Sequence, residues 1–387
     1  MTSTREPAEA MVGQASVPAR PRRQGRLRHH LVTRLDRQHS TRRPTALLCV
    51  LLSLASGCAS TWTLRTLQSP IALQWPYQPN PAKVTYVQSL TGFARNTDAG
   101  SVVRAVVFGS EDEERNAFVL PVAVATGSDG RIAVADMGRR CVHLYLPAQQ
   151  SYIRLTGSER GKIASPVALV FDDQLRLYVS DSTGKVFAFA PDGALIFVVA
   201  AAGRERLQRP TGIAYSPRTH LLYVADTLAS KVHALRTTGD AAFSFGERGD
   251  AEGQFNFPTH IFRSPAGELY VTDALNFRIE IFDEDGKLLG SFGHHGDGSG
   301  DLAMPKGVAV DADGVVYVVD GLFDNVQLFN RRGDFLLTLG QRGVDFGEFW
   351  LPSGAFISET HQLYVCDTYN RRIQVFQITE HYANGTT

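Results

Sequence analysis

Residues 269–282 read LYVTDALNFRIEIF and contain the pattern from which the fold follows. The two ends, LYVT and RIEIF, are rich in β-branched and aromatic residues, which is typical of strands. Asp273 lies between them, at the start of a short polar turn. Residues 363–376 read LYVCDTYNRRIQVF and repeat the same arrangement. The recurrence predicts a repeated unit that contains strand, turn and strand.

Six copies of this unit follow one another along the chain. A proline opens each copy, and an aspartate follows it by 15 residues, or by 16 in the third copy. Apolar runs after each proline and at the end of each copy predict two further strands. An apolar residue three positions before each proline, with glycines around it, predicts a bent crossover held by one buried side chain. The prolines and aspartates are Pro121 and Asp136, Pro166 and Asp181, Pro210 and Asp226, Pro258 and Asp273, Pro305 and Asp320, and Pro352 and Asp367.

Six four-stranded antiparallel units predict an all-β chain that folds as a six-bladed β-propeller over residues 121–378. The sixth copy holds only three strands before a tail at residues 379–387. An open ring would expose the edge of a sheet. We therefore expect residues 84–90, within a lead-in segment at 81–120, to supply the fourth strand of the last blade and close the ring.

The two quoted stretches resemble the core of NHL repeats, and residues 75–378 are similar to bacterial six-bladed NHL-type propeller lipoproteins. The copies are not uniform: the first has Ala133 where the others have Tyr, and the second is one residue short before Val186. The resemblance implies a lipid-anchored propeller held in the cell envelope.

The N-terminus has the features of an export signal. Arg42 and Arg43, an apolar run and small residues precede Cys58, as in a signal peptide. The sequence LASGC resembles a lipobox, which predicts cleavage after residue 57 and acylation of Cys58. An ordinary secretory signal with an incidental cysteine is the alternative. The long basic n-region indicates a misassigned start, for example with initiation at Val32.

The predicted lipid anchor on Cys58 indicates where in the cell the protein is expected. Residues 58–80 would then form a lipidated cysteine and a Pro-rich tether that reaches up to about 70 Å. Ala59 is not the Asp of enterobacterial inner-membrane lipoproteins, so the resemblance favours the outer membrane, facing the periplasm or the surface. Ten arginines fall within residues 1–43, so the remaining 29 basic and 36 acidic residues leave an acidic body. That charge argues against a nucleic-acid partner.

The chemistry-bearing residues are mostly explained by the repeat. The six aspartates occupy one equivalent position, where an Asp can accept N–H bonds from the next turn or pair with Arg278 or Arg372. His294 and His295 lie in a crossover and are interpreted as solvated. Two free thiols at Cys141 and Cys366 are favoured over a disulfide. We predict no catalytic residue, metal ligand or cofactor, because no motif for one is present.

One position is exceptional. Two places after each proline the chain has Ala or Gly in five copies, which implies crowding near the channel, but His260 in the fourth. A structural histidine is favoured; the alternative is a ligand contact at the channel mouth, with Lys306 near the matching position of the next blade. The function predicted is a membrane-anchored extracytoplasmic scaffold that binds an envelope protein or a glycan. The alternative is a channel-site enzyme resembling propeller lyases or lactonases.

Overall fold

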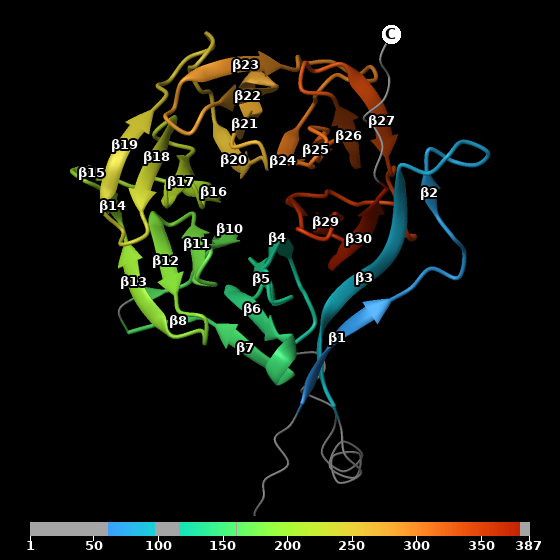
Figure 1. Ribbon diagram of the computed structural model, residues 1–387, viewed down its shortest axis with the longest axis horizontal. Coiled ribbons are helices and arrows are strands. Elements are labelled where there is room, and N and C mark those ends of the chain that lie inside the picture. Colours follow the sequence, from blue (N-terminus) through green and yellow to red (C-terminus); the bar gives the residue numbers. More distant parts are fainter. Residues whose placement is uncertain (1–60, 97–115, 160, 380–387) are drawn as a thin grey trace, which may run out of the picture. The chain divides into compact units, whose positions relative to one another are not determined.

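The computed structural model describes residues 61–96, 116–159 and 161–379. Its strands form six blades around a central channel, as the repeat predicts (Figure 1). The helical segments of these residues are two single 3₁₀ turns, η1 (Pro147–Gln149) and η2 (Ala274–Asn276), and no described helix is long and apolar enough to cross a membrane. The predicted signal peptide and Cys58 lie outside the described residues.

Blades 1 to 5 are four-stranded antiparallel sheets whose strands follow chain order from the channel outwards (Figure 1). Blade 1 comprises β4 (Pro121–Thr126), β5 (Ile132–Asp136), β6 (Cys141–Leu146) and β7 (Ser151–Leu155). Blade 2 comprises β10 (Pro166–Phe171), β11 (Leu177–Asp181), β12 (Lys185–Phe189) and β13 (Leu195–Val199). Blade 3 comprises β16 (Pro210–Ser216), β17 (Leu221–Asp226), β18 (Lys231–Arg236) and β19 (Ala241–Phe245).

The next two blades repeat this order. Two of the crossovers between blades each contain a short pair of strands. Blade 4 comprises β20 (Pro258–Arg263), β21 (Leu269–Asp273), β22 (Arg278–Phe282) and β23 (Leu288–Phe292). Blade 5 comprises β24 (Pro305–Val310), β25 (Val316–Asp320), β26 (Asn325–Phe329) and β27 (Phe335–Leu339). The crossover pairs are β8 (Gly157–Ser158) with β9 (Gly161–Lys162), and β14 (Ala201–Ala202) with β15 (Glu205–Arg206).

Blade 6 closes the ring with a strand from the N-terminal side, which confirms the predicted closure. Its own strands are β28 (Ala355–Ile357), β29 (Gln362–Asp367) and β30 (Arg372–Ile378). The fourth strand is β3 (Val84–Arg95), which pairs antiparallel with β30. In that pairing Val84 lies opposite Ile378, and Leu90 lies opposite Ile373.

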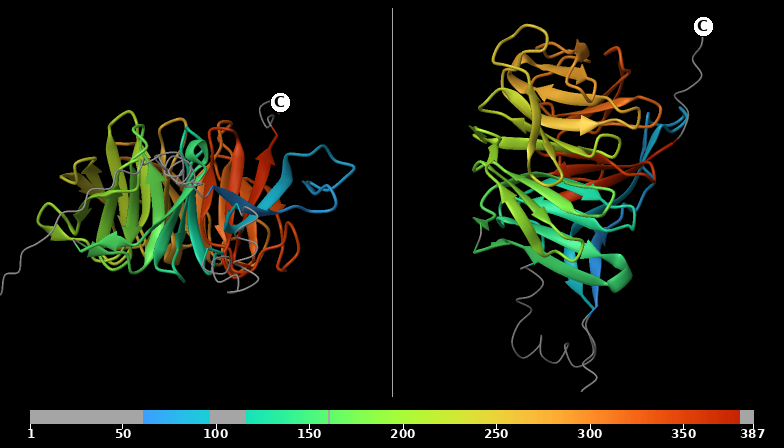
Figure 2. Two further views of the ribbon diagram at one scale, coloured as in Figure 1. Left: turned by 90° about the horizontal axis from the view of Figure 1, so that it is seen from below. Right: turned by 60° about the vertical axis from the view of Figure 1, so that its left-hand side comes forward.

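The predicted tether differs most from the structure. β1 (Trp62–Leu67) and β2 (Gln74–Trp75) both pair with β3, so these two parts of the predicted tether belong to the last sheet (Figures 1 and 2). The physical reason is burial: the Trp75 side chain is 3% exposed, and its ring lies 5.7 Å from that of Phe376. The first four residues of WTLRTL also alternate apolar and polar side chains, as a strand does.

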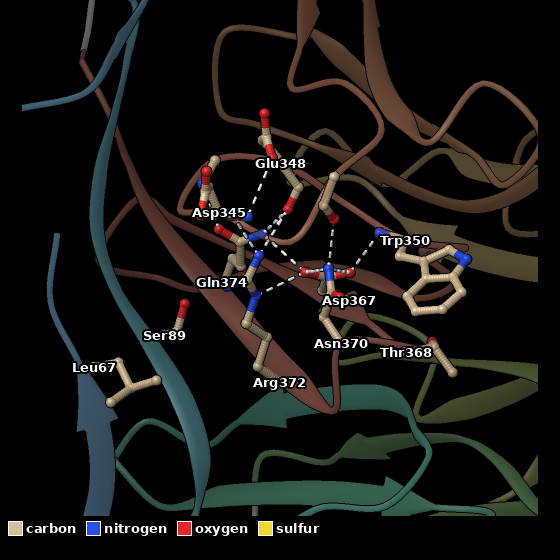
Figure 3. Close-up of polar contacts among 12 residues, drawn as sticks. Leu67, Ser89, Asp345, Glu348, Trp350, Asp367, Thr368, Asn370, Arg372 and Gln374 are labelled. Atoms are coloured by element: carbon tan, nitrogen blue, oxygen red, sulfur yellow. Dashed lines mark hydrogen bonds and ion pairs between the residues drawn. The ribbon is translucent and has the colours of Figure 1, made fainter.

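In each blade the repeated aspartate accepts hydrogen bonds from backbone N–H groups, as predicted. In blade 1 the Asp136 carboxylate accepts the N–H groups of Val119 and Leu120, just before the proline, and that of Arg139 in the following turn. In blade 6 Asp367 gathers a larger set of donors (Figure 3). These are Trp350 N, Asn370 Nδ2, Arg372 Nε and Gln374 Nε2.

The crossovers are held as the repeat predicts. The apolar side chain three positions before each proline is buried in all six blades, and none is more than 5% exposed. Gly157, Gly253, Gly300 and Gly347 adopt positive φ, the left-handed conformation that glycine tolerates best. The buried side chains are those of Phe118, Ile163, Leu207, Phe255, Leu302 and Phe349.

Candidate functional site

A cavity of about 500 Å³ occupies one end of the central channel and takes its lining from all six blades. It opens among the turns that join the first and second strands of the blades, and we call this side of the propeller the cavity face. The opposite side, where the turns follow the six aspartates, is the aspartate face. The cavity walls are mainly small or aliphatic, and include Ala123, Ala168, Val170, Ile213, Val310 and Ala355.

The inner strands approach one another closely around this channel, which confirms the predicted crowding. A Cβ atom built on Gly212 would lie 2.5 Å from the Ile261 nitrogen, and one on Gly307 would lie 2.6 Å from the Ala355 nitrogen. A Cβ on Gly354 would lie 2.5 Å from the Val122 oxygen. Real Cβ contacts are never this short, so only glycine permits the close packing of backbones at these positions.

His260 lies in the wall of the cavity. Its Nδ1 accepts the N–H of Val308 from blade 5 at 3.3 Å, so the proton of the neutral ring must sit on Nε2. Burial lowers the pKa of His260 to about 4, because the protonated ring would lose its hydration. Protein surrounds the ring, yet part of its surface remains accessible from the cavity. At neutral pH His260 is therefore an uncharged hydrogen-bond donor.

Lys306 does not join His260 at this site. It directly follows Pro305, one position before the residue of blade 5 that is equivalent to His260, and it is not among the described residues that line the cavity. A Cβ built on Gly321 would lie 2.7 Å from Lys306 Cε, so the absence of a side chain there makes room for the lysine. Burial lowers the pKa of Lys306, although Asp320 and Asp324 oppose the shift.

The structure reveals a second polar position that the sequence reading missed, on the third strand of the blades. In blade 6 Gln374 anchors the preceding crossover by accepting the N–H of Gly347 and donating to the Glu348 carbonyl. Gln327 of blade 5 makes the equivalent two bonds. Blade 4 has Glu280 instead, which accepts the N–H of Gly253 through Oε1. Its buried Oε2 has no hydrogen-bond partner, because a carboxylate cannot donate.

We expect Glu280→Gln to stabilise the protein by about 2 kcal/mol at pH 7.5. Burial raises the pKa of Glu280 from 4.5 to about 7, although Arg278 lies 3.0 Å away. The folded state thus binds this proton more tightly than the unfolded state, so the residue's contribution to stability falls as the pH rises from 4.5 towards 7. A glutamine would instead donate to the Gln254 carbonyl.

Chemical denaturation at pH 5.5 and 7.5 measures this effect. The gain from Glu280→Gln should be about half as large at pH 5.5 as at pH 7.5, because pH 5.5 lies between the unfolded and folded pKa values of Glu280. The matched control is Gln327→Glu, which should cost stability at pH 7.5 and recover it at lower pH. A Glu280→Gln variant that is less stable than the wild type at pH 7.5 would show that the ion pair with Arg278 outweighs the cost of burial.

No described group of three or more His, Cys, Asp or Glu side chains is placed to hold a metal ion. His294 pairs with Asp301 at 2.6 Å in an exposed crossover, as its loop position predicts. Cys141 and Cys366 are separate, buried free thiols, in line with the favoured reading. Burial raises the pKa of the Cys141 thiol to about 12 and also raises that of Cys366, so neither thiol is activated.

Comparisons with known proteins show a similarity in fold alone. No family model and no curated protein matches the chain. A gluconolactonase from Xanthomonas campestris is 17% identical, with a TM-score of 0.52, over 68% of this chain and 87% of that one. A Bacteroides thetaiotaomicron protein of unknown function is 13% identical, with a TM-score of 0.51, over 67% of this chain and 70% of that one.

A virginiamycin B lyase from Staphylococcus aureus is 13% identical, with a TM-score of 0.49, over 67% of this chain and 85% of that one. At these identities only architecture can be compared. The chain is a six-bladed β-propeller that shares its fold with lactonase structures.

Proposed function

We propose that this chain is an extracytoplasmic binding module, anchored in the bacterial cell envelope through an acylated Cys58. Its partner is an envelope protein that inserts into the channel cavity a mainly apolar side chain bearing one hydrogen-bond acceptor. The observation that carries this proposal is the composition of the cavity wall, which is mainly aliphatic and contains one uncharged donor, His260, in its depth. Pockets that bind by this means combine apolar walls with a few placed polar groups.

The wall composition also favours a protein over a glycan. A sugar presents hydroxyl groups around its ring, and each one loses hydrogen bonds to water if it enters an apolar cavity without a partner. The polar lining residues other than His260 are found among or near the turns of the mouth, and include Arg263, Ser358, Glu359 and His361. These side chains suit the polar rim of a protein interface whose apolar centre lies in the cavity.

The alternative is an enzyme with its site in the channel, since a lactonase shares the fold. His260 is the wall residue best suited to acid or base chemistry, but its Nδ1 is occupied by the Val308 N–H. Its Nε2 carries the proton of the neutral ring, and the ring, with a pKa of about 4, does not take up a second proton on Nδ1 at neutral pH. The described donors of the cavity do not supply the three or so ligands of a catalytic metal.

We expect His260→Ala to weaken partner capture about fivefold to tenfold, the value of one lost hydrogen bond. Crosslinking in intact cells followed by affinity capture measures the recovered partner. Val170→Trp should abolish capture by obstructing the cavity, whereas Ala241→Trp, on the exposed outer strand β19, should not change it. Unchanged capture by Val170→Trp would contradict the proposal. One zinc per chain that is lost in His260→Ala would favour the enzyme.

A further inference from the structure

A second cavity, of about 430 Å³, lies on the outer rim of the propeller, and we call it the rim pocket. One wall is the N-terminal segment that joins β1 to β2 and continues to Tyr77. The other wall is the crossover between β27 and β28, residues 340–354 (Figure 1). Small-molecule sites have volumes of roughly 300–1,000 Å³. The described lining of the rim pocket shares no residue with the channel cavity, so the two are separate sites.

Aromatic side chains from both walls line the rim pocket. Trp75 is buried, and a Cβ built on Gly347 would lie 2.6 Å from its ring, so the indole packs directly on the glycine. The Tyr77 side chain is 61% exposed, and its ring centroid lies 5.9 Å from that of Trp75. On the opposite wall the Phe346 ring lies 5.5 Å from that of Tyr86. The faces of such rings attract cations.

The rim pocket is negatively charged. Its charged lining residues are Asp345 and Glu348, and no described lysine or arginine lines it (Figure 3). Gln341 Nε2 and the Asp345 N–H donate to the Glu348 carboxylate at 3.0 and 3.1 Å, which lowers the pKa of Glu348. Asp345 is exposed, and no described group donates to its carboxylate. Arg342, the exposed base of this crossover, is directed instead towards Asp324 at 3.8 Å.

The rim pocket contains two residues that the repeat does not explain. Three crossovers contain a bonded pair of side chains seven residues apart, namely Gln341–Glu348, Glu247–Gln254 and His294–Asp301. This pair therefore belongs to the repeat, whereas Asp345 and Phe346 do not. The equivalent residues of the other two crossovers are Ala251 with Glu252, and Gly298 with Ser299. Of the three, only the crossover that the N-terminal segment covers combines an aromatic ring with an unpaired carboxylate.

A ligand that suits these walls is positively charged and largely apolar. A primary ammonium group has three N–H donors to satisfy, whereas the uncommitted carboxylate of the pocket is that of Asp345 alone. A quaternary ammonium group has no N–H, and aromatic sites recognise it through its methyl groups and its charge. Ile71 and Leu73 provide further apolar contacts.

We propose that the rim pocket binds a quaternary ammonium group, with its methyl groups against the Tyr77 and Phe346 rings and its charge opposite Asp345. This inference goes beyond the proposed function and does not depend on the acylation of Cys58 or on the channel cavity. The same chemical group occurs in free solutes and in lipid headgroups, and the experiment distinguishes these two sources.

Ligand-observed NMR titration with choline tests the proposal on residues 59–387, which contain every described strand. We expect Tyr77→Ala to weaken choline binding about fivefold, whereas Tyr77→Phe keeps the ring and should bind as the wild type does. Asp345→Asn should weaken binding about threefold and reduce its dependence on salt. The matched control Asp250→Asn changes an exposed carboxylate of another crossover and should leave binding unchanged.

Dimethylbutanol, the neutral carbon isostere of choline, separates charge recognition from apolar filling of the pocket. It should bind at least about fivefold more weakly than choline. Equal binding of the two compounds, no saturable binding of choline, or the same loss in Asp250→Asn as in Asp345→Asn would overturn the proposal. Melting curves must show that each variant folds.

Sedimentation with phosphatidylcholine vesicles identifies the source of the group. If the wild type binds these vesicles, and both free choline and Tyr77→Ala abolish the binding, the pocket takes a lipid headgroup. If choline binds but the vesicles do not, the pocket takes a free solute.

Discussion

Deleting residues 81–92 is expected to lower the melting temperature by about 15 °C or more, since 1 kcal/mol shifts a domain of this size by roughly 2–4 °C. The deletion removes the part of β3 that pairs with β30, and with it the buried side chains of Val84 and Leu90. Each such side chain contributes about 2 kcal/mol when buried. The edge of β30 would also be left unpaired, which invites aggregation.

The control is a chain that begins at residue 73 and lacks, of the described strands, only β1, which has four partly buried and two exposed residues and none that is fully buried. It should melt within a few degrees of the wild type. Differential scanning calorimetry compares the two. A deletion of 81–92 that melts like the control would show that the ring is stable without its closing strand.

Replacing Asp367 by Ala is expected to destabilise the protein by about 4 kcal/mol. The cost comes from the groups left behind: the Arg372 guanidinium is buried and loses its carboxylate partner at 2.8 Å, and Trp350 N, Asn370 and Gln374 lose an acceptor (Figure 3). Burial raises the pKa of Asp367 despite Arg372, so the pair itself gains little over apolar residues.

Two variants separate these contributions in urea denaturation. Asp345→Ala removes a nearby exposed carboxylate and should be neutral within about 0.5 kcal/mol. Asp367→Ala combined with Arg372→Met should recover part of the loss, because no charge remains buried alone. If the double variant is less stable than the single one, the remaining bonds of Arg372 to the Asp345 and Glu348 carbonyls outweigh the cost of its burial.

The sequence predicts those parts of the fold that recur. The prolines, the aspartates and the buried crossover residues were recognisable because six copies in phase separate a structural position from chance. β1 and β2 were missed for the same reason: no other copy has an equivalent, and the prolines around Trp75 favoured a tether. Glu280 is a different case. The sequence has a Glu in IEIF where VQLF and IQVF have a Gln. Only the structure shows that this side chain accepts the N–H of Gly253 in the crossover.

The site was predicted in part. His260 was identified because it breaks a row of small residues, and the structure places it in the cavity wall. Lys306 was paired with it because the two lie one residue apart in the repeat, but the space that Lys306 fills depends on Gly321 in the neighbouring turn.

The most direct test of the cavity as the binding site is photo-crosslinking in intact cells from benzoylphenylalanine placed at position 359, on the cavity mouth. The account predicts one envelope-protein adduct that disappears when Val170→Trp obstructs the cavity. Position 240, in the outermost turn of blade 3 on the same face, should give no such adduct. An adduct that survives Val170→Trp, or that forms equally well from position 240, would contradict binding in the channel.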